Sequence, residues 1–280
     1  MRNIDVRQIT EVVSQLCIQA NTVLRRDVLG ALKDALKRER KALARRILEV
    51  IIQNASVASS EGLPICQDTG VPIVFAELGS DVKVVGGSLK DAIDRGLIRG
   101  YKKGRLRKSI VEDPIKRSGT PKFGPGVIHF DLTRGNRLKL TVLPKGFGCE
   151  NKSKVRMLRP TAGVGEIKAF VVEVVKEAGP DACPPFVVGV GIGGTQDEAT
   201  RLAKTTLLRP INRVNPNRDI ARLEKDILKE INRLNLGPMG LGGKTTALGV
   251  NILTHPTHIA GLPCAVNISC HALRSASRTL

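Results

Sequence analysis

The chain has 280 residues, enough for one large domain or two lobes, and its hydrophobic fraction of 41% is ordinary for a globular protein. Aromatic residues make up only 2%, which argues against a stacking platform for single-stranded nucleic acid. No apolar run is long enough to span a membrane, and the N-terminus lacks the apolar core of a signal peptide, so we expect a cytoplasmic protein. The net charge of +19 suits nucleic acid, anionic metabolites or an acidic partner, but much of it falls on predicted helices, where a solvated basic face is the simpler interpretation.

The N-terminal part is predicted to be helical. Apolar residues recur at helical spacing through the first fifty-odd residues, and the second helix is expected to run from about Asp27 to about Gln53. A strand is expected at Val71–Leu78 and a short helix at 88–103. Residues 104–125 are basic and interrupted by Pro and Gly, so we predict a long functional loop.

The C-terminal part mixes strands and helices. Val127–Leu132 and Arg137–Leu143 are expected to pair as a hairpin. The later elements are predicted as helices at Val164–Ala178, about Gln196–Leu207 and 218–235, and as strands at Phe186–Ile192, Thr246–Leu253 and Ala265–Ile268. This order lacks a regular βαβ rhythm, so we predict an α+β fold: a helical region at about 1–60 and a mixed body at about 61–280, arranged as two lobes.

Two glycine-rich stretches resemble nucleotide-binding motifs but do not match them. GPMGLGGKTT has Pro238 where the phosphate-binding P-loop needs glycine, and GVGIGGT lacks the spacing of the dinucleotide fingerprint. Both are predicted to be loops whose backbone approaches a ligand closely and whose amides could hold a carboxylate.

Three of the six cysteines lie in settings that suit an iron–sulfur cluster. Cys66, Cys183 and Cys270 each stand beside Pro or Gly, or at the end of an apolar run. The chain has no CxxC pair, which disfavours zinc ribbons and bacterial-type ferredoxins. Cys17 and Cys264 fall in apolar patterns and are predicted to be buried, whereas Cys149, in a Gly-rich loop, is the rival ligand.

Five motifs in order carry a family resemblance. They are CQDTG at 66–70, PKGFGCENKSK at 144–154, CPPFVVGVGIGGT at 183–195, GPMGLGGKTTALGV at 237–250 and HPTHIAGLPCAVNISCHALR at 255–274. This series resembles the alpha subunit of the iron–sulfur-dependent hydro-lyases, the class I fumarate hydratase and L-tartrate dehydratase group, over nearly the whole chain. The resemblance implies a 4Fe–4S cluster held by Cys66, Cys183 and Cys270, with the two lobes around it. Three thiolates leave one iron open, which makes it a Lewis acid.

The resemblance also implies two catalytic residues. Asp68 would handle the proton of the leaving water as a general acid/base; the alternative is a turn-capping Asp before Thr69-Gly70, and within CQDTG we favour the catalytic role. His258 corresponds to the family's active-site histidine, which would orient the substrate carboxylate or tune the acid.

Substrate binding is expected from four further residues. Gln67 can hydrogen-bond the same substrate group as Asp68, and Arg107 would clamp a carboxylate with its guanidinium, the alternative being a solvated basic loop. Lys145 and Asn151 would contribute to the substrate pocket.

Single-chain members of the family carry a second domain with the catalytic base, which this sequence does not contain. The resemblance therefore implies a separate beta subunit, an α2β2 assembly and a small dicarboxylate substrate. The expected activity is fumarate hydratase, interconverting fumarate and L-malate as in the tricarboxylic acid cycle; the alternative is L-tartrate dehydratase, giving oxaloacetate. More distant hypotheses are a basic nucleic-acid-binding protein and an electron-transfer iron–sulfur protein.

Overall fold

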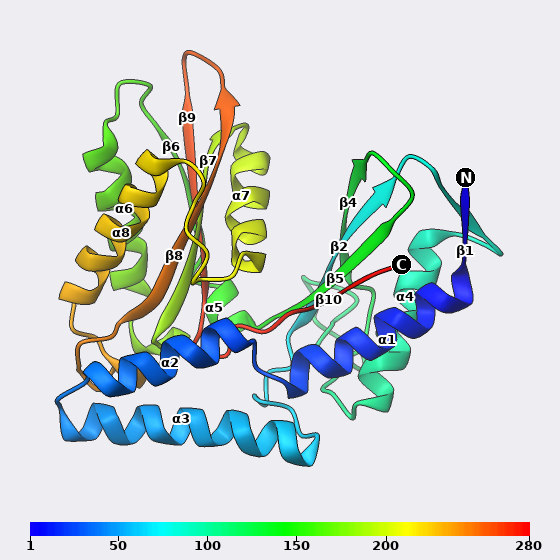
Figure 1. The fold of residues 1–280 in the computed structure, drawn as a ribbon, viewed down its shortest axis with the longest axis horizontal. Helices are drawn as coiled ribbons and strands as arrows, with labels where there is room; N and C mark the ends of the chain where they lie inside the picture. Colours follow the sequence, from blue (N-terminus) through cyan, green and yellow to red (C-terminus); the bar gives the residue numbers. More distant parts are fainter. The chain divides into compact units, whose positions relative to one another are not determined.

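The computed structural model describes all 280 residues, which form two compact units. Unit 1 comprises Met1–Leu24, Val57–Phe147 and Arg274–Leu280, and unit 2 comprises Arg25–Ser56 and Gly148–Leu273. Each unit contains a mixed four-stranded sheet and helices, which confirms the α+β class (Figure 1). None of the helices combines the length and apolarity needed to cross a membrane.

Unit 1 is built on a sheet of order β10-β5-β2-β4. Helices α1 and α4 pack together on one face of this sheet and enclose an apolar core (Figure 1). A small parallel pair, β1 with β3, lies at the N-terminus. The elements are β1 (Arg2–Asp5), α1 (Val6–Thr22), β2 (Val71–Gly79), β3 (Val82–Val85), α4 (Leu89–Lys103), β4 (Val127–Thr133), β5 (Leu138–Lys145) and β10 (Ala276–Thr279).

The expected hairpin of β4 with β5 is wrong, because β2 lies between them. Ile73 of β2 pairs with Val127 of β4 on one side and with Leu143 of β5 on the other. β2 buries five successive residues, whereas β4 is largely exposed, so the more apolar strand takes the central place. The connection at 134–136 instead crosses the end of β2, where the Gly79 N–H donates to the carbonyl of Arg137.

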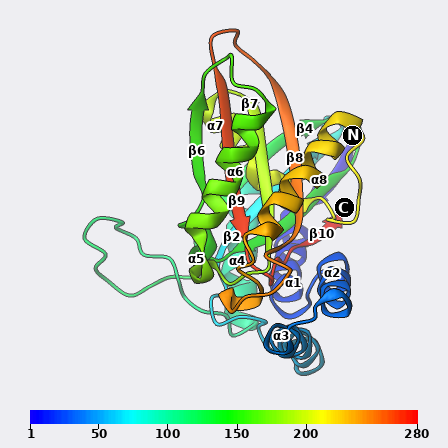
Figure 2. The same ribbon diagram turned by 90° about the vertical axis from the view of Figure 1, so that its left-hand side faces the viewer.

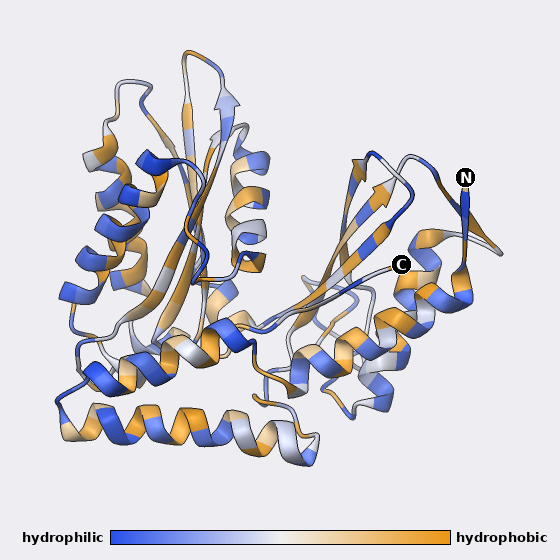
Figure 3. Ribbon diagram, viewed as in Figure 1, coloured by the Kyte–Doolittle hydropathy of each residue, from blue (hydrophilic) through white to orange (hydrophobic).

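Unit 2 is a three-layer arrangement around a sheet of order β6-β9-β7-β8. Helices α6 and α8 cover one face, in front of the sheet in Figure 2, and α7 covers the other. The elements are α2 (Arg26–Arg38), α3 (Ala42–Glu61, ending in unit 1), α5 (Phe147–Glu150), β6 (Lys154–Leu158), α6 (Val164–Ala178), β7 (Phe186–Gly194), α7 (Gln196–Thr205), α8 (Arg218–Arg233), β8 (Ala247–Thr257) and β9 (Leu262–Ser269), with short 3-10 turns at Pro180–Ala182, Thr206–Leu208 and Pro238–Gly240. The basic helix predicted at 218–235 is confirmed as α8, which buries Leu223, Ile227 and Ile231 and turns its hydrophilic side outward (Figure 3).

The single helix expected from Asp27 to Gln53 is wrong, because Glu39 divides it into α2 and α3. The Glu39 carboxylate is buried and accepts hydrogen bonds from the backbone N–H groups of Arg40, Lys41 and Lys244. Burial alone would raise the pKa of this carboxyl, but the three backbone donors hold it below its usual value. The same contacts tie the 237–246 loop to the start of α3.

The helical residues 1–60 do not form a unit of their own. Helix α1 belongs to unit 1 and α2 to unit 2. The change near residue 60 is therefore a change in secondary structure and not the border between the units. That residues 1–280 act as one subunit domain stays a prediction.

Glycines 189 and 191 lie inside β7, which confirms the strand predicted at Phe186–Ile192 and shows that the loop also predicted for GVGIGGT is wrong. A Cβ at Gly189 would stand 2.1 Å from the carbonyl oxygen of Ala203, and one at Gly191 would stand 2.0 Å from that of Ala199. Both oxygens belong to α7. These glycines therefore let a helix lie directly on the strand, and they serve packing and not a ligand.

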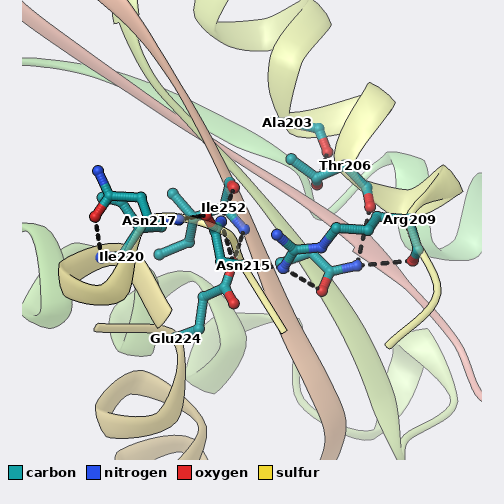
Figure 4. A network of polar contacts seen from close by, with 9 residues as sticks. Ala203, Thr206, Arg209, Asn215, Asn217, Ile220, Glu224 and Ile252 are labelled. Carbon is teal, nitrogen blue, oxygen red and sulfur yellow. Dashed lines mark hydrogen bonds and ion pairs between the residues drawn. The ribbon is translucent and has the colours of Figure 1, made fainter. Parts of the chain in front are cut away.

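A buried polar network joins α8 to β8 in unit 2 (Figure 4). The Glu224 carboxylate accepts hydrogen bonds from the Arg209 guanidinium, the Asn215 side chain at 3.1 Å and the Ile252 N–H at 2.7 Å. Because this carboxylate has a cationic partner and further donors, the network offers no open site.

Candidate functional site

The CQDTG loop of unit 1 holds the Asp68 carboxylate in one direction. One carboxylate oxygen accepts the N–H of Gly70 at 2.9 Å, and the other accepts the N–H of Phe147 at 2.8 Å. The first bond is the turn-capping contact expected of an Asp in this position. The second comes from a residue 79 positions away, so the fold adds an anchor that a local turn does not need.

The end of β5 lies directly against this loop. Gly70 has a φ of +74°, and a Cβ there would come within 2.8 Å of the Lys145 backbone. Only glycine suits this position, because its conformation is left-handed and its surroundings leave no room for a side chain. The Lys145 side chain is itself buried, at 2% exposure. The structure therefore brings Lys145 beside the loop as a packed residue.

Two side chains that the sequence analysis missed, Tyr101 and Arg274, hold the backbone of this loop. The buried Tyr101 hydroxyl donates to the Thr69 carbonyl at 2.9 Å, and the Arg274 guanidinium donates to the Asp68 carbonyl. The Thr69 hydroxyl accepts the N–H of Arg107 at 3.0 Å. Burial raises the pKa of Tyr101, so its phenol stays protonated and remains a donor. The signals for these residues were the lone tyrosine and the arginine of CHALR.

Four predicted residues therefore gather at one loop cluster in unit 1. Gln67 is exposed beside the partly exposed Cys66, with 3.4 Å between the Cys66 sulfur and the Gln67 side-chain oxygen. Asp68 follows, and the Arg107 backbone is fastened to the same loop while its side chain is exposed. A thiol, an amide, a carboxylate and an arginine together can bind and protonate a small anion.

In unit 2 the structure brings Cys183 and Cys270 to the same end of the sheet. Cys183 precedes β7, and Cys270 directly follows β9. The His271 N–H donates to the Cys183 carbonyl at 3.4 Å, and the His271 ring nitrogen Nδ1 lies 3.1 Å from the same oxygen. Cys183 has a φ of +55°, a left-handed conformation that is costly for a residue other than glycine and is typical of functional sites.

The cysteines divide into two groups by exposure. Cys66, Cys183 and Cys270 are partly exposed, whereas Cys17, Cys149 and Cys264 are buried, as predicted for Cys17 and Cys264. Burial raises the pKa of the Cys17 and Cys264 thiols to about 12, which keeps them protonated and unsuited to iron.

The rival ligand Cys149 is buried in the structure. Its buried thiol donates to the Ala182 carbonyl at 3.2 Å, beneath the turn that leads into Cys183. The three accessible thiols therefore fit the donor chemistry of an iron–sulfur cluster.

The three-cysteine site itself stays a prediction. Cys66 lies in unit 1, and Cys183 and Cys270 lie in unit 2. The structure contains no group of three or more His, Cys, Asp or Glu side chains arranged for a metal ion.

His258 is not brought to the cysteine end of unit 2. The cysteines adjoin the end of β7 where Val187 pairs with Ser269, whereas His258 follows the opposite end, where Gly194 pairs with Thr257. Seven residue steps along β7 separate Val187 from Gly194, about 23 Å at ~3.3 Å per residue. His258 lines a surface pocket of about 360 Å³ there.

Asn151 is exposed in unit 2, just after α5. The neighbouring Lys152 pairs with Asp181 at 3.2 Å, two residues before Cys183. The PKGFGCENKSK segment therefore runs beside the Cys183 turn, which is consistent with the expected placement of Asn151 near the site.

A family model described as "Fumarate hydratase (Fumerase)" matches residues 10–279. The chain belongs to this family. A protein of Methanocaldococcus jannaschii named "Putative L(+)-tartrate dehydratase subunit alpha" is 38% identical over 283 residues, covering 98% of this chain and 98% of that protein. The L(+)-tartrate dehydratase subunit alpha of Escherichia coli O157:H7 is 30% identical over 275 residues, covering 96% of this chain and 89% of that protein. The chain is thus a member of the hydro-lyase family that includes fumarate hydratase and tartrate dehydratase alpha subunits.

Proposed function

We propose that this chain is the alpha subunit of an iron–sulfur hydro-lyase that interconverts fumarate and L-malate. The observation that carries the proposal is the exposure of Cys66, Cys183 and Cys270 in three loops, one of them beside the fixed carboxylate of Asp68, while the other three cysteines are buried. The description of the matching family model supports fumarate as the substrate.

We infer that these three cysteines hold a 4Fe–4S cluster. When bound, a cluster with three protein ligands supplies an open iron that acts as a Lewis acid on the substrate's C–O bond.

Three residues of this chain then have separate roles in the reaction. As a carboxylic acid, Asp68 gives its proton to the leaving hydroxyl and becomes a carboxylate, which takes a proton from water in the reverse direction. Two backbone N–H groups fix the direction of this side chain. Gln67 hydrogen-bonds the same hydroxyl, and the exposed Arg107 guanidinium clamps a substrate carboxylate.

Three other predicted residues have smaller parts. Lys145 is buried, with its backbone packed against Gly70, and it supports the loop; the exposed Asn151 contributes to the substrate pocket. Within one chain, His258 and the two cysteines of unit 2 lie at opposite ends of one sheet, so the proposal gives His258 no part in that chain's own proton transfer.

We infer a separate beta subunit that supplies the catalytic base, in an α2β2 assembly. The relatives are named as alpha subunits, which supports a partner polypeptide. The formal charge of +19 suits attraction of dianionic substrates.

L-tartrate dehydratase is the second candidate function, because both relatives carry that name. Malate and tartrate differ by one hydroxyl group. The same proton transfer by Asp68 and the same clamp by Arg107 serve either substrate.

Anaerobic kinetics on the chain co-purified with its beta subunit test the proposal. We expect kcat/KM for L-malate and fumarate to exceed that for L(+)-tartrate, and we expect little turnover by the chain alone. A strong preference for tartrate contradicts the fumarate assignment and establishes the second candidate. Absence of activity on all three substrates contradicts the hydro-lyase proposal for this chain.

A further inference from the structure

Arg274 is a buried cation without a buried anion. Its side chain sits beneath the CQDTG loop with 4% exposure, and its Nη2 donates to the Asp68 carbonyl. The nitrogens Nε and Nη1 are fully buried and have no hydrogen-bond partner. No carboxylate forms an ion pair with this guanidinium, unlike the partly buried Arg209, which contacts Glu224.

Stability alone does not explain an arginine at this position. Burying an unpaired guanidinium costs several kcal/mol, and a single hydrogen bond to a carbonyl offsets only part of that cost. Tyr101 and the Thr69 hydroxyl already fasten the neighbouring part of the loop. A neutral side chain of similar length would fill the space without the desolvation cost. Residues that break such a rule without a local gain are characteristic of functional sites.

Arg274 is one of three residues that hold Asp68 in place. Arg274 holds the Asp68 carbonyl, while the N–H groups of Gly70 and Phe147 hold the Asp68 carboxylate. The main chain and the side chain of Asp68 are thus fixed by three separate segments of the sequence. A proton donor needs a fixed position and orientation, because a displacement of ~1 Å can lower the rate on the order of 10²-fold.

We propose that Arg274 is a positioning residue that fixes Asp68 for proton transfer. The inference deepens the proposed function and rests on it. Arg274 acts through the backbone of Asp68 and does not itself touch the substrate. Its buried charge lowers the stability of the fold, and its hydrogen bond fixes the position of Asp68.

The test compares Arg274→Met with Arg278→Met in the co-purified, cluster-loaded enzyme. Arg278 lies four residues further along the same segment, is exposed and bonds only Gln15 at 2.7 Å, so it is the matched control. For Arg274→Met we expect kcat to fall on the order of 10²-fold while KM changes less than about threefold. The iron content should stay at the wild-type value, and the unfolding temperature of the chain should be equal or higher.

Arg274→Lys is the conservative variant. Lysine keeps the charge and can reach the same carbonyl, so we expect it to recover at least about tenfold of the lost kcat. The Arg278→Met enzyme should match the wild type in every readout.

Other results overturn the inference. An unchanged kcat in Arg274→Met removes any positioning role, and the proposed function then stands without it. Failure to fold, or a loss of iron and a lower unfolding temperature in step with the loss of activity, assigns Arg274 to structure alone. An inactive wild-type enzyme contradicts the proposed function first, before any variant is compared, and the inference falls with it.

Discussion

The two cysteine-bearing regions are positioned in different ways. In unit 1, the Cys66 loop is held by buried side chains from distant parts of the chain, namely Tyr101 and Arg274. In unit 2, Cys183 and Cys270 are placed by the ends of two adjacent strands and by main-chain bonds to His271. The first region can therefore be disturbed by single side chains without unfolding, whereas the second depends on the packing of the whole sheet.

Removing a predicted cysteine ligand from either region should have the largest effect on iron content and activity. We expect Cys66→Ser, Cys183→Ser and Cys270→Ser each to lose the cluster and nearly all activity, because a thiolate ligand is missing. Iron and sulfide analysis of the anaerobically reconstituted protein measures this. Cys149→Ser and Cys264→Ser are the buried controls and should keep wild-type iron; iron loss in Cys149→Ser alone would move the ligand assignment to Cys149.

Asp68→Asn should separate chemistry from cluster binding in unit 1. The amide keeps the shape of the side chain but cannot transfer the proton, so kcat should fall by ~10² to 10⁴-fold with iron content unchanged. Steady-state kinetics with L-malate give the value, and Asp94→Asn in α4 serves as the control. A loss of less than about tenfold would leave Asp68 as a turn-capping residue only.

Gly191→Ala should disturb unit 2 through its packing. The added Cβ would meet the carbonyl of Ala199, so α7 must move away from β7 at a cost of ~1 to 3 kcal/mol. Denaturant unfolding measures the free energy. Gly165→Ala is the control, because a Cβ there meets nothing within 4 Å. Equal stability of the two variants would show that α7 does not rest on the strand.

Glu39→Gln should give the smallest effect, and one that depends on pH. The pKa of Glu39 is lowered in the folded protein from an ordinary value of 4.5, so the stability that its charge contributes is present above pH 4.5 and is lost as the pH falls through the folded pKa. We expect the variant to be less stable by ~1 to 3 kcal/mol at pH 7 and close to the wild type at pH 3. A difference that does not change with pH would exclude the carboxylate as the cause.

The sequence predicted what local patterns determine. Helices at 88–103 and 164–178 and strands at 71–78 and 186–192 are confirmed, because their apolar periods and their Gly and Pro boundaries are local signals. The short strands β1, β3, β6 and β10 were missed, since four or five residues carry little periodicity and owe their state to their partners. The hairpin was wrong for the same reason: pairing depends on a third strand.

At the site, the sequence motif identified Asp68 but not the residues that hold it. Tyr101 and Arg274 stand 32 and 206 positions from the loop carbonyls that they bond, and they meet the loop only in the fold. The glycine-rich stretch GVGIGGT shows that composition alone can also indicate a ligand site wrongly. Its composition indicated a ligand loop, yet a helix and not a ligand approaches the backbone at Gly189 and Gly191.

The most direct test of the account is EPR spectroscopy of the anaerobically reconstituted chain with its beta subunit. We expect about four irons per chain, as a single 4Fe–4S cluster requires, and, for the chemically reduced cluster, an EPR spectrum that changes when L-malate or fumarate is added. The same change should be reduced when Arg107 is replaced by Met, because a carboxylate clamp is lost. A chain that binds no iron, or a cluster whose spectrum ignores dicarboxylates, would contradict the claim that this protein binds its substrate at an open iron.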